Sequence, residues 1–365
     1  MLLLLLAGLL LHRTAGDDCA LAAPDELALA ERTAAAAEGC ETVLFTTLYY
    51  PDGTLLENPA ARLAFDTNGT CAVLVAGGRA AAALARHCDL GAWTLVVHEQ
   101  HGDGGRRRAS RLVKLAPRLF FPRARFTVFV DWKLQLRRPP RWLVEQSVLR
   151  FGAGFAAFRH PCTTPARAGA DPCDRRRPGE KWWKAEARRV IELRKTAEPE
   201  KLAAQVARLD ALGPGRLDDF AEGGFVARDE RDPAARRVSC AWRGAYAASG
   251  DRDQLALAEA LDRGVPSGVS AQRLHGASTV EDGVLLLGAD ACGDLCPWDE
   301  NRATFALARK YVAMTNGRGG VALRNPKLAA LGASACAPGQ PHWVEDRRHR
   351  LPDELRTRLN ARRPS

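Results

Sequence analysis

The sequence predicts an α/β fold in which a mostly parallel sheet is flanked by helices. Segments rich in β-branched and aromatic residues alternate with segments of helical spacing, an order typical of parallel sheets. The clearest strand lies in Phe126–Lys133, whose apolar run suits a strand buried on both faces. With 365 residues, of which 46% are hydrophobic and 26% charged, the chain can build a large core.

The elements before this strand follow from short local patterns. Residues 17–40 are rich in Ala and Glu and are expected to form an N-terminal helix or stalk. Runs of strand-forming residues and of Ala then predict three strands and two helices: strands Thr42–Tyr50, Cys71–Ala76 and Trp93–His98, a helix ending near His87, and a helix at Ala109–Ala116.

The elements after the central strand continue the alternation. They are expected to be a helix at Pro139–Arg150, a strand at Gly154–Arg159, helices at Lys181–Thr196 and Glu198–Leu212, a strand at Gly224–Arg228 and a helix at Arg252–Arg263. Gly and Pro become more frequent from Gly264 onward, which places a domain boundary there. Residues 265–365 are expected to form a C-terminal extension of unknown role.

Three features indicate the secretory pathway. Residues 1–16 hold an apolar run, too short to span a bilayer, that suits a signal peptide or a short signal-anchor. Ten cysteines indicate disulfides, although their spacing does not give the pairing. Asn68, followed by Gly69-Thr70, is a glycosylation sequon. We expect the Golgi lumen or secretion, with membrane contact only through the N-terminal segment if it stays uncleaved.

The net charge and the absence of several known motifs limit the classes of partner and of enzyme that are expected. The formal charge of +10 favours an anionic partner such as a nucleotide diphosphate, an acidic glycan or a phosphorylated surface. No zinc-finger or RNA-binding signature accompanies the charge, so nucleic acid is not expected. There is no P-loop, no convincing GxGxxG and no GxSxG, which argues against an ATPase, a Rossmann-type dinucleotide enzyme and an α/β-hydrolase.

Two polar side chains follow strands at the end where open α/β sheets bind their ligands. Asp131 comes after the central strand, and His160, held extended by Pro161, comes after Gly154–Arg159. Both are therefore candidates to meet a substrate or a metal. The alternatives are an Asp that caps a turn and a His with a structural or surface role.

Two helices carry further candidates. Arg111 and Lys114 share one helix face that leads towards Asp131, where they could neutralise a pyrophosphate or form a solvated basic face. Gln254, three residues after Asp251, completes the spacing of a capping box, which explains both residues without any function. Capping does not explain Asp253, a second acid in the same helical turn.

The stretch Arg108–Leu136 (RASRLVKLAPRLFFPRARFTVFVDWKLQL) resembles the core of the plant-type "turgor regulation defect / mucilage-related" glycosyltransferase-like domain family. The resemblance covers about residues 41–264 and continues in order through Phe155–Pro161, Trp183–Ile191, Gln205–Gly213, Trp242 and Arg252–Leu255. It implies a GT-A-like glycosyltransferase of the secretory pathway that uses a nucleotide sugar.

The resemblance also assigns roles to individual residues. It implies donor binding by Arg111, Lys114, Asp131 and Lys133, acceptor-binding or supporting roles for Glu186, Trp242, Arg252 and Gln254, and catalysis by Asp253 as general base with His160 as its substitute. Asp131-Trp132-Lys133 stands where such enzymes usually have an Asp-x-Asp metal motif. Asp131 is thus the candidate ligand for Mn²⁺ or Mg²⁺, while Lys133 could replace part of the charge of the metal.

Two other functions stay open. One is hydrolysis of a lipid amide such as ceramide, an activity linked with this family, although no HExxH-like cluster is present to activate water. The other is a glycan-binding relative that has lost its chemistry. Departures from the family pattern are consistent with the latter: Thr163 replaces an Arg, Ala245 replaces an acid, and Asp229-Glu230 replace a His near Arg228.

Overall fold

A computed structural model of the protein describes most of the region between Cys19 and Leu287. The residues described are 19–21, 23–49, 69–77, 92–98, 105–131, 139–159, 180–192, 196, 198–212, 221–249, 252–264, 272–273, 279–281 and 284–287. Of the predicted elements, the helix ending near His87 lies outside them. So do Asn68, Lys133, His160 and nearly all of the C-terminal extension.

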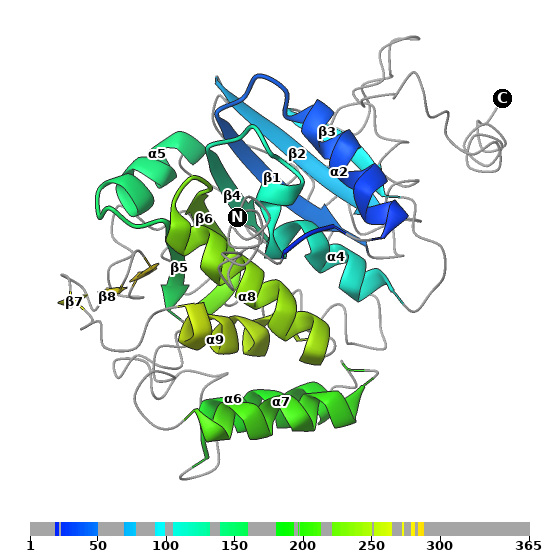
Figure 1. Ribbon diagram of the computed structural model, residues 1–365, viewed down its shortest axis with the longest axis vertical. Helices are drawn as coiled ribbons and strands as arrows, with labels where there is room; N and C mark the ends of the chain where they lie inside the picture. The colour runs from blue at the N-terminus through cyan, green and yellow to red at the C-terminus, as the bar shows by residue number, and fades with distance from the viewer. Residues whose placement is uncertain are drawn as a thin grey trace, which may run out of the picture.

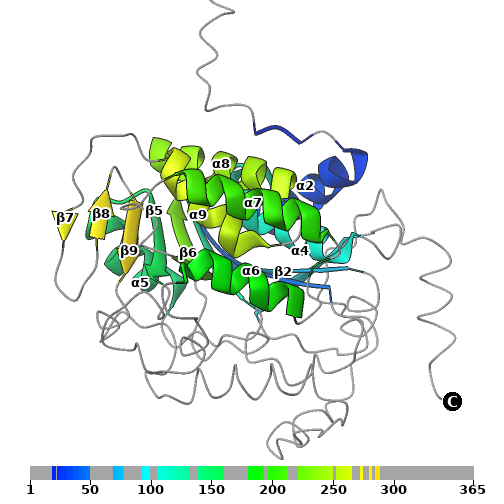
Figure 2. The same ribbon diagram turned by 90° about the horizontal axis from the view of Figure 1, so that it is seen from below.

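Within the described residues, the chain forms a nine-stranded sheet in the order β3-β2-β1-β4-β6-β5-β9-β8-β7 (Figures 1 and 2). The strands are β1 (Thr42–Leu48), β2 (Thr70–Gly77), β3 (Trp93–His98), β4 (Phe126–Val130), β5 (Phe155–Arg159), β6 (Ala221–Asp229), β7 (Gln272–Arg273), β8 (Thr279–Glu281) and β9 (Val284–Leu287). The sheet thus continues past the boundary that the sequence predicts at Gly264.

Most of the sheet is parallel, which confirms the predicted α/β class. Strands β3, β2, β1 and β4 are parallel neighbours, and β5 is parallel to β9. Strand β6 runs antiparallel between β4 and β5, so β4 and β5 point the same way. The carboxyl ends of β1, β2, β3, β4 and β5 therefore lie at one edge.

Helices cover both faces of the sheet because its central strands are apolar on both sides; β1 and β4 are buried throughout. On one face, α2 (Pro24–Ala36), α4 (Arg106–Leu115) and α8 (Pro233–Ser249) share a core with the strands, to which Leu29, Val113 and Trp242 contribute. The opposite face is covered by α5 (Pro140–Val144), which continues as a π-helical turn, Glu145–Leu149, and contacts β1, β4 and β6. Helix α8 has no counterpart among the predicted elements.

A second helical layer packs outside the first. Helix α9 (Asp253–Gly264) packs against α8 and β6. Helices α6 (Trp182–Glu192) and α7 (Pro199–Ala211) lie side by side against α9 (Figures 1 and 2). Their shared core includes Trp182, Leu209 and Leu255. A single 3₁₀ turn, Pro117–Leu119, leads from α4 to β4. No helix in the described part of the chain is both long and apolar enough to span a bilayer.

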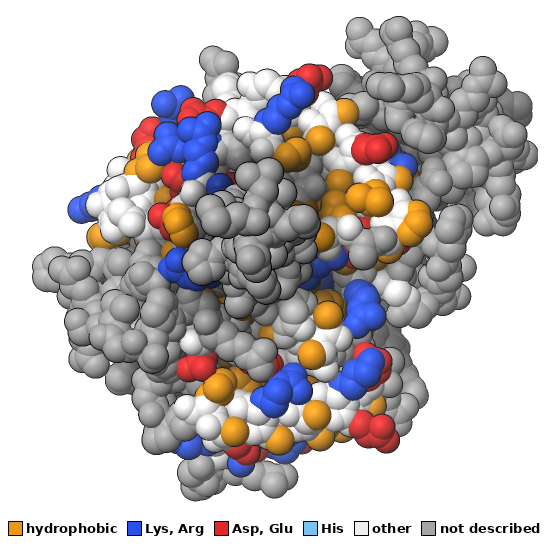
Figure 3. Space-filling view, viewed as in Figure 1, with side chains coloured by type: hydrophobic (Ala, Val, Ile, Leu, Met, Phe, Trp, Pro, Cys, Tyr) orange, Lys and Arg blue, Asp and Glu red, His pale blue; other side chains and the backbone are white. Residues whose placement is uncertain are grey.

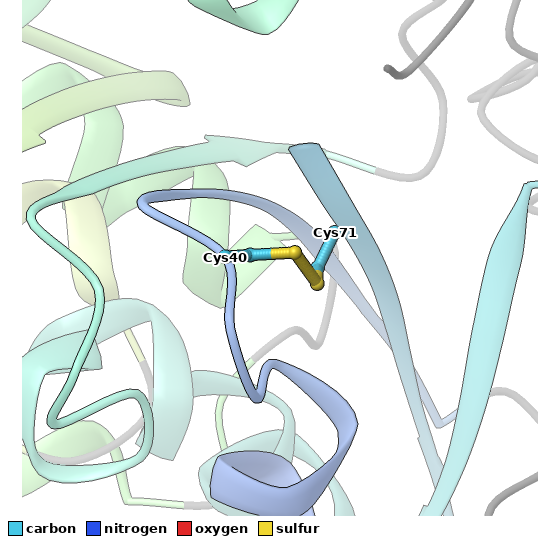
Figure 4. Close-up of a disulfide and its surroundings, with 2 residues drawn as sticks. All are labelled: Cys40 and Cys71. Carbon is cyan, nitrogen blue, oxygen red and sulfur yellow. A yellow bond between two sulfur atoms is a disulfide. The ribbon is translucent and has the colours of Figure 1, made fainter. Parts of the chain in front are cut away.

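A disulfide joins Cys40, just before β1, to Cys71 of β2, with the two Cα atoms 5.8 Å apart (Figure 4). It connects the first strand to its parallel neighbour at their amino ends. The expectation that the cysteines form disulfides is confirmed for this pair. Cys19 and Cys240 are the other cysteines within the described residues, and both are thiols.

Candidate functional site

Asp131 lies at the edge formed by the carboxyl ends of the parallel strands, directly after β4. Its backbone N–H donates to the carbonyl oxygen of Gly224 at 2.7 Å, which fixes the end of β4 against β6. The side chain of Asp131 is half-buried. Strand β5 ends at the same edge with Arg159, and His160, the next residue, lies outside the described part.

Three charged side chains from two helices meet next to this edge. Lys114 and Arg111 lie one turn apart on α4, and both contact the carboxylate of Asp253, the first residue of α9. The Nε atom of Arg111 lies 3.2 Å from Oδ2 of Asp253, and Nζ of Lys114 donates to the same oxygen. Lys114 is 4% exposed and Asp253 is 3% exposed, so their ion pair is inside the protein. The fold therefore brings together three predicted site residues from distant parts of the sequence.

The charges of this cluster control one another's protonation. Burial alone would raise the pKa of the Asp253 carboxyl. The positive charges of Arg111, Lys114 and Arg252 outweigh it and hold that pKa well below its ordinary range. Burial lowers the pKa of Lys114, while the negative charges of Asp253 and Asp131 oppose this shift. Asp253 is consequently ionised, and its negative charge is balanced by the neighbouring cations.

Aromatic rings and strand backbone enclose the Lys114 ammonium. Its Nζ lies 4.9 Å from the ring centroid of Phe129 and 5.2 Å from that of Trp242. The indole N–H of Trp242 donates to the backbone carbonyl oxygen of Asp253 at 2.7 Å. A Cβ added at Gly223 of β6 would lie 2.9 Å from Nζ. A side chain larger than glycine at residue 223 would therefore require the ammonium to shift.

Arg252 extends the cluster towards α6. Its Nε donates to Oε1 of Glu186 at 2.7 Å, and its Nη2 donates to the side-chain oxygen of Gln254. These contacts fix α6 against the beginning of α9, one residue from Asp253. The supporting roles expected of Glu186, Arg252 and Gln254 stay predictions, but the three residues do lie together.

Arg228 of β6, which no motif in the sequence singles out, contacts the cluster from within the sheet. This fully buried side chain donates from Nη2 to the carbonyl oxygen of Lys114 at 2.9 Å. Its guanidinium carbon lies 5.2 Å from the ring centroid of Phe155 and 5.8 Å from that of Trp242. Burial lowers the pKa of Arg228 to about 10, against the opposing charge of Glu230. The available sequence signal is a basic residue within an apolar strand.

Several residues that the sequence singles out lie outside the described part of the structure. They are Lys133, His160, Asn68 and Thr163. Ala245, which replaces an acid of the family, is buried in the core.

A divalent cation needs several oxygen or nitrogen ligands around one point. Within the described residues, no three His, Cys, Asp or Glu side chains come close enough to hold a metal. Asp131, the candidate ligand, acts electrostatically on Lys114. Metal binding by Asp131 stays a prediction, because one or two carboxylates can bind Mg²⁺ together with the phosphates of a substrate.

Surface charge on the face seen in Figure 3 has a different distribution. Lys and Arg side chains there are scattered and lie among Asp and Glu side chains. Of the cations around Asp253, Lys114 lies in the interior, whereas the side chain of Arg111 is 25% exposed.

Comparison with known protein families identifies an α/β domain of the glycosyltransferase-like class. The model of the family described as "TOD1/MUCI70, glycosyltransferase-like domain" matches residues 40–269, and the chain belongs to this family. None of the curated proteins compared with the chain matches it in sequence.

Two solved structures with the same kind of activity in their titles resemble the chain weakly. The apo structure of the bifunctional glycosyltransferase WbbM has 11% identity and a TM-score of 0.34, and the likeness covers 60% of this chain and 37% of that one. The chain therefore spans little more than a third of WbbM. The apo form of mouse xyloside xylosyltransferase 1 has 14% identity and a TM-score of 0.31, with 60% and 80% covered. Similarity at this level carries no information about the substrate.

Proposed function

We propose that the protein transfers a sugar from a nucleotide-sugar donor to a glycan or glycoprotein acceptor in the secretory pathway. Membership of a glycosyltransferase-like family supports the class of reaction. The observation that carries the proposal is the convergence of Arg111, Lys114 and Asp253 beside Asp131 at the carboxyl edge of the sheet. Cations held in place at the carboxyl ends of the strands, where they are partly shielded from water, are suited to stabilise a leaving diphosphate.

The reaction makes one bond and breaks another. The acceptor oxygen bonds to the anomeric carbon of the sugar, the bond from that carbon to the diphosphate breaks, and the hydroxyl proton passes to a base. Arg111, whose side chain is 25% exposed, would contact the diphosphate, while Lys114 would add positive charge from the interior. Asp131 would orient the ribose or the sugar, and Lys133 would add a further cation.

The contacts of Asp253 bear on its predicted role as general base. A general base is most effective when its pKa lies near the working pH. The pKa of Asp253 is held low, and its Oδ2 is occupied by two cations. These contacts favour a positioning role, in which Asp253 holds Lys114 and Arg111 in place. Base function by Asp253 stays a prediction, with His160 as the other candidate.

The secretory location is part of the proposal and has separate support. The Cys40–Cys71 disulfide fits an oxidising compartment, as do the apolar N-terminal segment and the sequon at Asn68. The Golgi lumen supplies both nucleotide sugars and glycan acceptors. A tagged full-length chain whose glycans at Asn68 are removed by endoglycosidase would support this location, whereas an unglycosylated cytosolic chain would contradict it.

The test of the proposed reaction is release of a nucleoside diphosphate. Full-length protein from a secretory host is incubated with a panel of nucleotide sugars and glycan acceptors, with and without manganese. If the protein is a transferase, at least one nucleotide sugar should release its nucleoside diphosphate. The rate of this release should fall about 100-fold or more in Lys114→Met. The matched control is Arg123→Met, which removes an exposed cation that pairs with the exposed Glu38. Equal losses in the two variants would contradict the assigned role of Lys114.

The same assay separates the alternative functions. Cleavage of ceramide without any donor turnover would identify a hydrolase. Binding of a glycan without release of a nucleoside diphosphate would identify a relative that has lost its chemistry. Either result would overturn the transferase proposal.

A further inference from the structure

Cys19 and Cys240 are far apart in the sequence, yet their thiols lie in hydrogen-bond contact. Cys19 precedes α2 and is 6% exposed, while Cys240 lies on α8 and is half-buried. A disulfide between two such sulfur atoms requires them to approach to about 2.05 Å. With the Cys40–Cys71 disulfide, every cysteine within the described residues therefore has another cysteine beside it.

The two backbones are also held together independently of these thiols. Arg243, one turn along α8 from Cys240, donates from Nη2 to Oε2 of Glu26 in α2 at 2.8 Å, and both side chains are largely buried. Leu21 packs against the main core. The segment around Cys19 is thus fixed on α8 by charge and packing before any covalent bond forms, which keeps the sulfur atoms close.

An arginine contacts the sulfur of Cys240 directly. Nη2 of Arg118 lies 3.3 Å from Sγ of Cys240 and donates to it. A guanidinium beside a sulfur favours the thiolate, which is the reactive form. The hydrogen bond to Cys240 and burial raise the pKa of the Cys19 thiol well above its ordinary range, and the positive charges of Arg118 and Arg243 offset only part of this shift. Since Cys240 is the more exposed of the two, it is the sulfur that an oxidant would reach first.

We propose that Cys19 and Cys240 form a second disulfide in the mature protein. In this step the thiolate of Cys240 attacks an oxidised disulfide, such as that of glutathione or of a thiol oxidoreductase, and releases one of its sulfurs as a thiol. The Cys19 thiolate then attacks the resulting mixed disulfide and releases the second thiol. Two protons leave the protein, two electrons pass to the oxidant, and one sulfur–sulfur bond is gained.

This bond joins a residue outside the region matched by the family model to a helix inside it. Helix α8 also carries Trp242, whose indole N–H holds the first residue of α9. The disulfide would therefore fasten the segment before α2 to the helix that supports the candidate site. Its formation does not depend on the proposed transferase activity, so the two proposals can fail separately.

Peptide mapping tests the proposal directly. Full-length protein from a secretory host is equilibrated in a glutathione redox buffer in which the Cys40–Cys71 bond is fully formed. Remaining thiols are blocked with N-ethylmaleimide, and the unreduced protein is digested. The expected result is a linked pair of peptides containing Cys19 and Cys240, which disappears after reduction. Maleimide on both residues, a different partner for either one, or a mature chain that lacks Cys19 would overturn the proposal.

Thermal unfolding of variants provides an independent readout. If the bond exists, Cys19→Ser, Cys240→Ser and the double variant should lower Tm by the same amount, because each removes the same cross-link. Cys40→Ser and Cys71→Ser form the matched control pair. Losses for Cys19→Ser and Cys240→Ser that simply add in the double variant would show that the thiols contribute only packing.

Discussion

The indole N–H of Trp242 donates to the backbone carbonyl oxygen of Asp253 at 2.7 Å, and both residues are buried. This bond joins α8 to the first residue of α9 and so fixes the position of the Asp253 carboxylate. The same indole ring lies beside the Lys114 ammonium. One aromatic side chain thus sets the position of both partners in the central ion pair.

Trp242→Phe should lower both stability and activity. It keeps an aromatic ring but removes the indole hydrogen bond to the buried carbonyl oxygen of Asp253, which costs about 0.5–1.5 kcal/mol. Urea unfolding and donor turnover measure the two effects. Trp183→Phe is the matched control, since it removes an indole bond of the same 2.7 Å length to Asp210 between α6 and α7. A loss of turnover as large in the control would show that general destabilisation, and not the site, is responsible.

Asp253→Asn should reveal a pH-dependent contribution to stability. The folded-state pKa of Asp253 lies below its unfolded value of about 3.9, so its stabilising contribution is fully present above that value and is lost as pH falls through the folded-state pKa. Breaking this buried pair should cost about 3 kcal/mol at pH 7. The difference between wild type and variant should stay constant down to about pH 5 and shrink below about pH 4.

Urea unfolding of both proteins between pH 7 and pH 3 checks this expectation. Glu198→Gln, which removes a carboxylate paired with Lys201 at the surface, should change stability by no measurable amount at any of these pH values. A difference for Asp253→Asn that grows as the pH falls from 5 to 3 would contradict the assigned ion pairs.

Gly223→Ala should displace the Lys114 ammonium and reduce turnover by about 10-fold or more, because the new methyl group would lie 2.9 Å from Nζ. Gly244→Ala on α8 is the matched control. A Cβ there meets no described atom within 4 Å, and alanine in a helix gains up to about 1 kcal/mol over glycine. The measurement is the rate at which each variant turns over the nucleotide-sugar donor. An unchanged rate in Gly223→Ala would show that turnover does not depend on the position of Lys114.

Arg228→Met should affect activity more than stability. The substitution removes the hydrogen bond to the carbonyl of Lys114, in the last turn of α4, but it also relieves the burial of a guanidinium whose Nε and Nη1 have no hydrogen-bond partner among the described residues. We expect a stability change within about 1.5 kcal/mol and roughly 10-fold slower turnover. Loss of folding without any effect on the turnover of the folded fraction would assign Arg228 a purely structural role.

Local patterns in the sequence predict most of the strands because each is a compact apolar run bounded by polar residues. The antiparallel direction of β6 could not be predicted in this way, since a strand buried on both faces has the same composition in either direction. Helix α8 was missed because its buried side includes Ala234, Ala235 and Ala245, which give little hydrophobic contrast.

The candidate site was predicted in part. Arg111, Lys114 and Asp253 came from helical spacing and family resemblance, and the structure brings them together. Their contacts depend on distances across the fold that no local pattern contains. Arg228 was missed because a single basic residue in a strand suggests solvent exposure, whereas here the neighbouring rings and the end of α4 enclose it.

The pairing of β5 with β9 has a practical consequence for shortened versions of the protein. The family match ends at residue 269, but the main chain of β5 finds hydrogen-bond partners in residues 284–287. A fragment cut at the end of the match would leave one side of β5 as an open edge, and such edges recruit strands from other molecules and promote aggregation. Expression of this domain should therefore extend at least to Leu287.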